Sequence, residues 1–182
     1  MKITVLYGST RADGNTELLT EYALQGISAE RVVLKDYYIK DIVDQRHEAQ
    51  GFSEVKDDYN TIIDAMLAAD VLIFATPIYW YGMSSVMKTF IDRWSQTVRD
   101  EKYPNFKELM SKKKAYMIAV GGDNPTKKGL PLIQQFKYIC EFIGLNFQGF
   151  VLGEGVKPRD ILEDKKALQE IDQLNEQLKG LN

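Results

Sequence analysis

The chain has 182 residues, one cysteine, one histidine and a formal net charge of −3, with 45% hydrophobic and 27% charged residues. These fractions are typical of globular proteins, and a domain averages about 150 residues, so we expect one folded domain over residues 1–182. A single cysteine excludes an intramolecular disulfide, a four-cysteine zinc site and a cysteine-ligated iron–sulfur cluster. With one histidine as well, we predict no metal site and expect carboxylate, hydroxyl or organic-cofactor chemistry.

Charge and hydropathy also limit the partners. Lysine and arginine together number 23 against 26 aspartate and glutamate residues, so the chain lacks the basic excess that grips nucleic-acid phosphates. No apolar stretch approaches the roughly 18 residues of a membrane span, because Asp70 and Pro77 interrupt the longest candidate, residues 68–83. The N-terminus turns polar by Gly8, too early for a signal peptide. We therefore expect no nucleic-acid or membrane partner and a cytoplasmic location.

Strand and helix patterns alternate along the first part of the chain. Residues 3–7 are β-branched and apolar and predict a buried strand, and a helical apolar spacing follows over 17–25. A second strand is expected at 31–34 and a second helix at 59–69. Between them, residues 36–58 are mostly polar and too numerous for an ordinary connection, so we predict an insertion there.

The second part continues the alternation. Residues 71–75 form the most hydrophobic run and predict a central strand, and Ser84 is placed to cap a helix running to about residue 97. The remaining expected elements are strands at 115–120 and 146–152, a helix at 131–143, and a last helix opening with a capping box at 160–163. Five strands with intervening helices predict an α/β three-layer sandwich around a five-stranded parallel sheet. Right-handed crossovers leave two common strand orders, of which we expect 2-1-3-4-5.

The loop after the first strand has the composition of an anion site. In Gly8-Ser-Thr-Arg-Ala-Asp-Gly-Asn-Thr16, hydroxyl and amide donors precede a helix N-terminus, where unpaired backbone N–H groups favour a phosphate. Arg11 adds a charge, and Gly14 allows close approach of the backbone. The pattern matches neither the Walker loop nor the dinucleotide G-x-G-x-x-G motif. The alternative is that Ser9, Asn15 and Thr16 only cap the helix and Arg11 is a solvated surface charge.

The loop after the central strand is aromatic. Tyr79, Trp80 and Tyr81 follow Pro77 at the carboxyl end of the sheet, where ligands of such folds bind. Three consecutive aromatic side chains in this place suit a planar ring system. The alternative is that they fill the core or a subunit contact.

Two motifs together resemble a known family. The sequence reads G-S-T-R-A-D-G-N-T after the first strand and A-D-V-L-I-F-A-T-P-I-Y-W-Y-G-M-S-S-V-M-K-T-F-I-D-R-W later. These blocks and the order of elements resemble the NAD(P)H-dependent FMN reductases, which are flavodoxin-like. The resemblance implies a homodimer or homotetramer that binds FMN at the carboxyl ends of the strands and uses NAD(P)H as co-substrate. The iron–sulfur flavoprotein branch carries a cysteine cluster in the region of residues 40–58, whereas this chain has none there.

The resemblance also assigns residues. Positions matching the family's phosphate loop are Ser9, Arg11, Gly14, Asn15 and Thr16. Those expected to line the isoalloxazine ring are Pro77, Ile78, Tyr79, Trp80 and Gly82, and a third contact is expected from Gly121, Gly122 and Asp123. No side chain is assigned as a catalytic acid or base, because hydride transfer takes place on the flavin.

Two functions of different class follow from these observations. The preferred one is an oxidoreductase that transfers hydride from NAD(P)H to FMN and then reduces a small acceptor: a quinone, an azo or nitro compound, a flavin or a metal ion. The alternative is a flavin-binding electron carrier or sensor that acts through a protein partner. Arg11 and the aromatic loop favour the first.

Overall fold

The computed structural model describes residues 1–181 and contains one five-stranded parallel sheet of order β2-β1-β3-β4-β5. The strands are β1 (Ile3–Tyr7), β2 (Glu30–Val33), β3 (Val71–Pro77), β4 (Lys114–Gly121) and β5 (Asn146–Glu154). The predicted strand order is therefore confirmed. Pro77 is the last residue of the central strand β3, so the N–H that it lacks is missing only at the end of the ladder.

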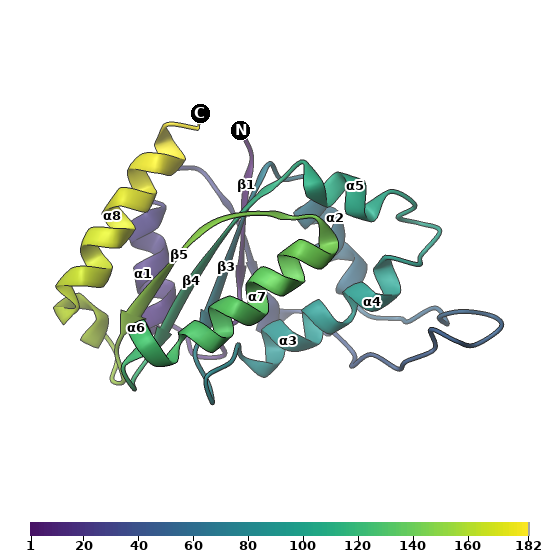
Figure 1. Ribbon diagram of the computed structural model, residues 1–182, viewed down its shortest axis with the longest axis horizontal. Helices are drawn as coiled ribbons and strands as arrows, with labels where there is room; N and C mark the ends of the chain where they lie inside the picture. The colour runs from purple at the N-terminus through teal and green to yellow at the C-terminus, as the bar shows by residue number, and fades with distance from the viewer. Residues whose placement is uncertain (182) are drawn as a thin grey trace.

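Helices cover both faces of the sheet (Figure 1). On one face lie α1 (Asn15–Ala23) and α8 (Lys165–Lys179). On the other lie α2 (Tyr59–Leu67), α3 (Ser85–Asp92), α4 (Trp94–Thr97), α5 (Phe106–Ser111) and α7 (Leu130–Ile143). Short elements are α6 (Pro125–Lys128) and the 3₁₀ helices η1 (Leu34–Asp36) and η2 (Asp160–Glu163). The arrangement is the expected three-layer sandwich, and no helix in the described residues is long and apolar enough to cross a membrane.

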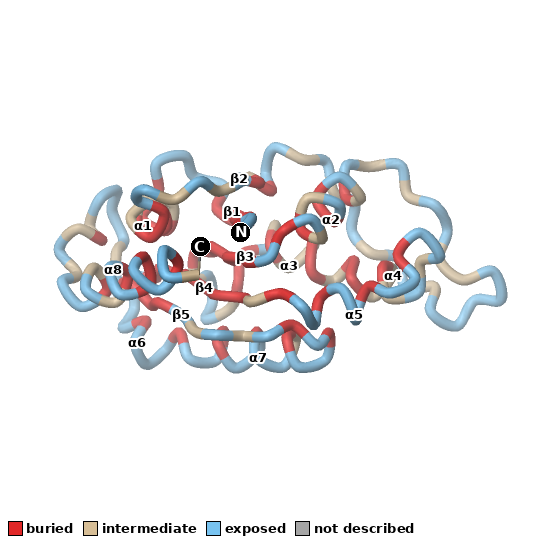
Figure 2. Tube along the Cα trace, turned by 90° about the horizontal axis from the view of Figure 1, so that it is seen from above, coloured by how far each residue is buried: buried red, intermediate tan, exposed pale blue. Residues whose placement is uncertain are grey.

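The central strand divides the core into two halves. All seven residues of β3 are buried, as predicted for the most hydrophobic strand. Because side chains alternate across a strand, Leu72 and Phe74 pack under α2, α3 and α7, whereas Val71, Ile73 and Ala75 pack under α1 and α8. Figure 2 shows the buried residues concentrated along the strands and on the inner sides of the helices.

Two helices differ from the prediction by more than two residues at a boundary. The helix expected from Ser84 to residue 97 is divided at Arg93 into α3 and α4, and the bond from Arg93 N–H to Thr89 O stretches to 3.4 Å there. The last helix begins at Lys165, because Asp164 rather than Asp160 caps it by accepting from Ala167 N at 3.0 Å. Asp160 instead accepts from Lys157 N at 2.7 Å and closes the turn before η2. The short helices α5 and α6 were not predicted.

The polar segment 36–58 extends beyond the body of the molecule (Figure 1). Its two ends are joined at the base: Asp58 accepts from Tyr38 N at 2.8 Å, and Asp57 accepts from Lys40 N at 3.0 Å. Most of its residues are exposed, as Figure 2 shows. The paired carboxylates fix where this irregular segment leaves and rejoins the sandwich.

Candidate functional site

The site lies at the carboxyl edge of the sheet, where the loops after β1, β3, β4 and β5 converge. The first of these loops leads directly into α1, whose N-cap position is taken by Gly14 without a side-chain cap. The first N–H groups of α1 consequently have no capping side chain to bond, which is the arrangement that binds anions. Ser9 Oγ lies 3.2 Å from both the backbone N and the backbone O of Arg11 and holds the loop in its turn.

Ser84 joins the first loop to the second. As predicted, it caps α3, accepting from Met87 N at 3.2 Å. Its hydroxyl also donates to Gly8 O at 2.6 Å, so the loops after β1 and β3 are hydrogen-bonded to each other. A Cβ at Gly8 would lie 3.0 Å from Ser84 Oγ, and this close approach explains a glycine there.

Asn15 connects the first loop to the one after β5. Its side chain is 7% exposed, and its Nδ2 donates to Lys157 O at 2.8 Å. A Cβ at Gly155 would lie only 2.7 Å from that Nδ2, so the loop after β5 approaches Asn15 without room for a side chain. Asn15 was expected to donate to an anion, and the structure uses its amide to close this part of the site.

These loops enclose a cavity of about 190 Å³, which we call the loop cavity. It brings together most of the residues that the sequence singled out: Ser9, Arg11, Gly14, Asn15, Thr16, Pro77, Ile78, Tyr79, Gly121 and Gly122. It is also lined by Val120, Gly155 and Val156, which the sequence interpretation missed. A glycine directly after the last strand of a parallel sheet was the signal that could have found Gly155. No carboxylate is among the described residues lining the loop cavity, and Arg11 supplies a positive charge.

The aromatic turn, residues 79–82, forms the opposite wall. Backbone bonds of 3.0 Å join Tyr79 and Gly82 in both directions, and the two residues between them have positive φ, 49° at Trp80 and 64° at Tyr81. Gly82 thus closes the turn and lines no described cavity of the site, whereas Tyr79 lines the loop cavity. Trp80 is 96% exposed.

A second cavity, the turn cavity of about 220 Å³, adjoins the first and shares Ile78, Gly121 and Gly122 with it. Trp80 and Asp123, both predicted site residues, line this one. Asp123 accepts a hydrogen bond from Tyr81 Oη at 2.9 Å and pairs with Lys128 Nζ at 2.8 Å. The ammonium group of Lys128, followed by the Tyr81 hydroxyl, lowers the pKa of the Asp123 carboxyl.

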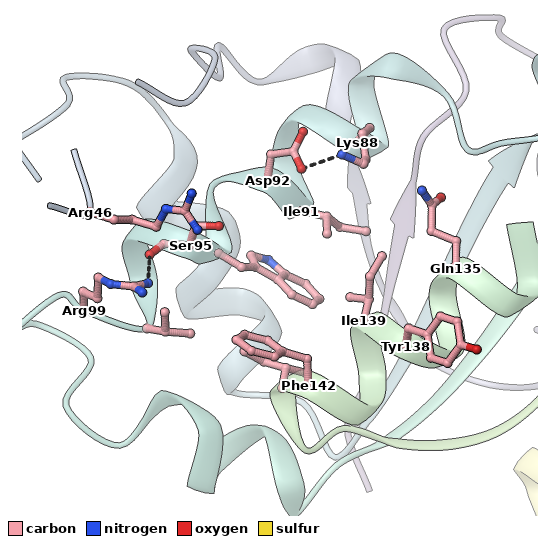
Figure 3. Close-up of a pocket in the computed structure, with 13 residues that line it drawn as sticks. Arg46, Lys88, Ile91, Asp92, Ser95, Arg99, Gln135, Tyr138, Ile139 and Phe142 are labelled. Carbon is pink, nitrogen blue, oxygen red and sulfur yellow. Dashed lines mark hydrogen bonds and ion pairs between the residues drawn. The ribbon is translucent and has the colours of Figure 1, made fainter. Parts of the chain in front are cut away.

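A larger cavity of about 410 Å³ lies between α3–α4 and α7 and contains none of the predicted site residues. Figure 3 shows Ile91, Ile139 and Phe142 around its apolar interior, with Arg46 and Arg99 on one side and the Lys88–Asp92 ion pair on another. Within the described residues, no group of three histidine, cysteine, aspartate or glutamate side chains is arranged to hold a metal ion. The polar loops at the sheet edge are therefore the candidate site.

Comparison with known proteins shows the family of the chain. Residues 1–142 match the family described as NADPH-dependent FMN reductase. A putative NAD(P)H-dependent FMN-containing oxidoreductase, YwqN of Bacillus subtilis, is 58% identical over 168 residues, which is 92% of this chain and 93% of that protein. The solved structure of a Trp repressor binding protein from Bacillus subtilis superposes with a TM-score of 0.81 at 51% identity, covering 95% of this chain and 97% of the other.

A more distant structure shares the fold alone. The FMN-dependent NADH-azoreductase of Bacillus anthracis, solved in complex with FMN, aligns with a TM-score of 0.70 at 13% identity over 98% of this chain and 99% of its own. The family match over residues 1–142 and the 58% identity to YwqN carry the assignment. The chain belongs to the NADPH-dependent FMN reductase family of flavodoxin-like oxidoreductases.

Proposed function

We propose that the loop cavity and the aromatic turn together hold FMN, and that the protein catalyses electron transfer from NAD(P)H to a small acceptor: a quinone, an azo or nitro compound, a flavin or a metal ion. When bound, FMN would supply the redox chemistry between NAD(P)H and the acceptor. The protein's own residues bind and orient the cofactor and leave one side of it open to substrates.

The loop cavity carries this proposal. It combines the N-terminus of α1, the guanidinium of Arg11 and a lining without carboxylates among the described residues, which suits a phosphate dianion. Glycines let the loops of the site pack closely against one another: a Cβ at Gly121 would lie 3.0 Å from Ile78 Cβ, and one at Gly122 would lie 2.4 Å from Val156 Cγ2. The residues present therefore fit FMN.

Each predicted residue receives a role on this basis. Ser9, Arg11, Gly14, Asn15 and Thr16 would surround the phosphate, with Asn15 acting through its backbone while its side chain holds the loop after β5. The ring would lie against Pro77, Ile78, Tyr79 and Trp80, in a turn closed by Gly82. Gly121 and Gly122 would form the third contact with FMN, and Asp123 would contribute to that contact from the turn cavity, which it lines.

We also propose that the protein is a cytoplasmic homodimer or homotetramer. The outer side of α7 exposes two aromatic side chains, Tyr138 at 62% and Phe142 at 69%, beside the apolar interior of the larger cavity in Figure 3. Exposed aromatic side chains next to an apolar hollow are typical of a subunit contact. A second copy of this chain is the occupant that we propose for that face, and sedimentation or light scattering of the purified protein tests it.

The decisive experiment is the anaerobic half-reaction. The purified protein is loaded with FMN, mixed with NADPH or NADH, and followed at the visible flavin absorption band; we expect bleaching with at least one nucleotide, and reoxidation on adding a quinone or azo dye. A protein that binds FMN but is not bleached by either nucleotide would be an electron carrier or sensor instead. A protein that takes up no flavin would overturn both functions.

A further inference from the structure

The aromatic turn is built from residues that its backbone disfavours. Trp80 and Tyr81 occupy the two central positions of a two-residue turn, with φ of 49° and 64°. Such turns strongly prefer asparagine and glycine, because a bulky side chain at positive φ crowds its own backbone. Residues held in this region cost free energy and persist only when surrounding contacts hold them. Some contact must therefore stabilise this turn.

The contact is a cluster of three side chains from three elements, which we call the Asp123 cluster: Tyr81, Asp123 and Lys128. Tyr81 Oη donates to Asp123 Oδ2 at 2.9 Å from the turn itself. Lys128 Nζ, at the end of α6, donates to both carboxylate oxygens of Asp123 at 2.8 Å. Lys128 thus holds the carboxylate in a position where it accepts a hydrogen bond from the hydroxyl of Tyr81.

The base of the turn is already fixed by packing, so the cluster acts on its tip. Ile78 N–H bonds to Val120 O at 2.8 Å, and the Ile78 side chain is close to Gly121 and Gly129, where an added Cβ would lie 3.0 Å from it. Beyond Ile78, the bonds between Tyr79 and Gly82 set the shape of the turn but not its tilt toward either cavity. Tyr81 Oη to Asp123 is the side-chain bond that joins the turn to the β4–α6 loop.

The same turn presents Tyr79 to the loop cavity and Trp80 to the turn cavity. We propose that the Asp123 cluster is a positioning device: Tyr81, Asp123 and Lys128 hold the aromatic turn against the strain of its backbone and so determine how tightly the flavin ring is bound. The inference rests on the proposed function, because it assumes that the ring lies against this turn. In this scheme Tyr81 and Lys128 act through the turn, without contact to the phosphate.

The test compares two flavins that differ only in the phosphate. Dissociation constants of FMN and riboflavin are measured by fluorescence quenching for the full-length protein and for Tyr81→Phe and Lys128→Met. Lys127→Met is the matched control, since Lys127 lies beside Lys128 on α6 and is also exposed, whereas Lys128 is the residue that pairs with Asp123. The near-ultraviolet circular dichroism of the bound flavin reports the geometry of the ring environment, and thermal unfolding confirms that each variant is folded.

We expect Tyr81→Phe to weaken FMN and riboflavin by the same factor, about 2- to 10-fold for the loss of one hydrogen bond. Lys128→Met should also weaken both flavins equally but by a smaller factor, because the half-exposed pair of Lys128 with Asp123 contributes little by itself. The circular dichroism of the bound flavin should change in both variants, and Lys127→Met should match the wild type. The double variant should lose little more affinity than Tyr81→Phe alone, because both changes act through Asp123.

Other outcomes overturn the inference. Variants that bind both flavins as the wild type does would show that the turn needs no support from Asp123. A loss restricted to FMN would place the cluster at the phosphate rather than at the ring. If the wild-type protein itself binds neither flavin, the proposed function fails and the inference with it, a result distinct from tight wild-type binding with unaffected variants.

Discussion

The guanidinium of Arg93 and the carboxylate of Asp57 form a buried ion pair, with Nη1 2.7 Å from Oδ2 and both side chains 2% exposed. Arg93 Nη1 also donates to Lys40 O at 3.0 Å, and the guanidinium lies 4.4 Å from the centre of the Tyr59 ring. The pair thereby joins the two ends of segment 36–58 to the junction between α3 and α4. Arg93 makes this contact from the residue that divides the predicted helix.

Removing one partner of this pair should destabilise the protein strongly. Arg93→Met leaves the Asp57 carboxylate buried without its cation, and breaking such a pair costs about 3–5 kcal/mol. We expect a loss of that size in the free energy of unfolding measured by urea denaturation. Arg46→Met is the control, because Arg46 pairs with Asp44 in the same segment with both side chains about half exposed, and surface pairs contribute little. Equal stability of the two variants would contradict the structural role of Arg93.

The residues predicted well from sequence are those whose signal is local. β1 matches the prediction residue for residue, and Ser84 caps a helix as expected. Both features depend on only a few consecutive residues: the apolar run of a strand and the hydroxyl side chain of an N-cap. No local signal predicts that Arg93 is buried, because charged and apolar residues alternate around it on the helix. Its partner Asp57 lies 36 residues away in the sequence. The positive φ of Trp80 and Tyr81 was equally hidden, since their propensities argue against it and only tertiary contacts impose it.

The candidate site shows the same limit. The loop after β1 and the aromatic turn could be found from composition, because donors, glycines and aromatic residues cluster there in sequence. Val156 could not, because its residue type carries no signal of a site and it lines the cavity only through the position of the loop after β5. The hydrogen bond from the Asn15 amide to Lys157 O likewise depends on tertiary structure, because the two residues are 142 positions apart in the sequence.

Gly155 provides a direct test of how tightly the site is built. Gly155→Ala would place a Cβ 2.7 Å from Asn15 Nδ2 and 3.1 Å from the backbone N of Ile161, so Asn15 has to move and its bond to Lys157 O is strained. We expect the free energy of unfolding to fall by about 1–3 kcal/mol and the dissociation constant for FMN to rise. Gly149→Ala, within the preceding strand β5, is the control, because its Cβ would meet Tyr116 Cδ1 at 4.0 Å, an ordinary contact. Unchanged FMN affinity in Gly155→Ala would remove the loop after β5 from the site.

Cys140, the single cysteine of the chain, should be unreactive in the folded protein. It is 1% exposed on α7, and burial raises the pKa of its thiol from 9.0 to about 12. Since the thiolate is the reactive form, a disulfide-exchange reagent at pH 8.5 should modify the native protein far more slowly than the urea-unfolded chain. The folded state favours the neutral thiol, so this group's contribution to stability is complete below pH 9 and declines between pH 9 and about 12. Equal modification rates in the two states would contradict the burial of Cys140.

Arg11 is expected to select the phosphorylated flavin. It lines the loop cavity beside the N-terminus of α1, and no carboxylate shares that lining in the described residues. A hydrogen bond to a charged group contributes about 1.5–3 kcal/mol, so Arg11→Ala should weaken FMN binding by about 10- to 100-fold. Riboflavin, which has no phosphate, should bind the variant and the wild type equally, and Arg159→Ala, an exposed arginine outside the cavity lining, should leave both affinities unchanged. A parallel loss of riboflavin affinity would show that Arg11 shapes the cavity instead of binding the phosphate. If instead riboflavin binding is weakened only by the variants of the Asp123 cluster, the phosphate of FMN is assigned to Arg11 and the ring to the aromatic turn.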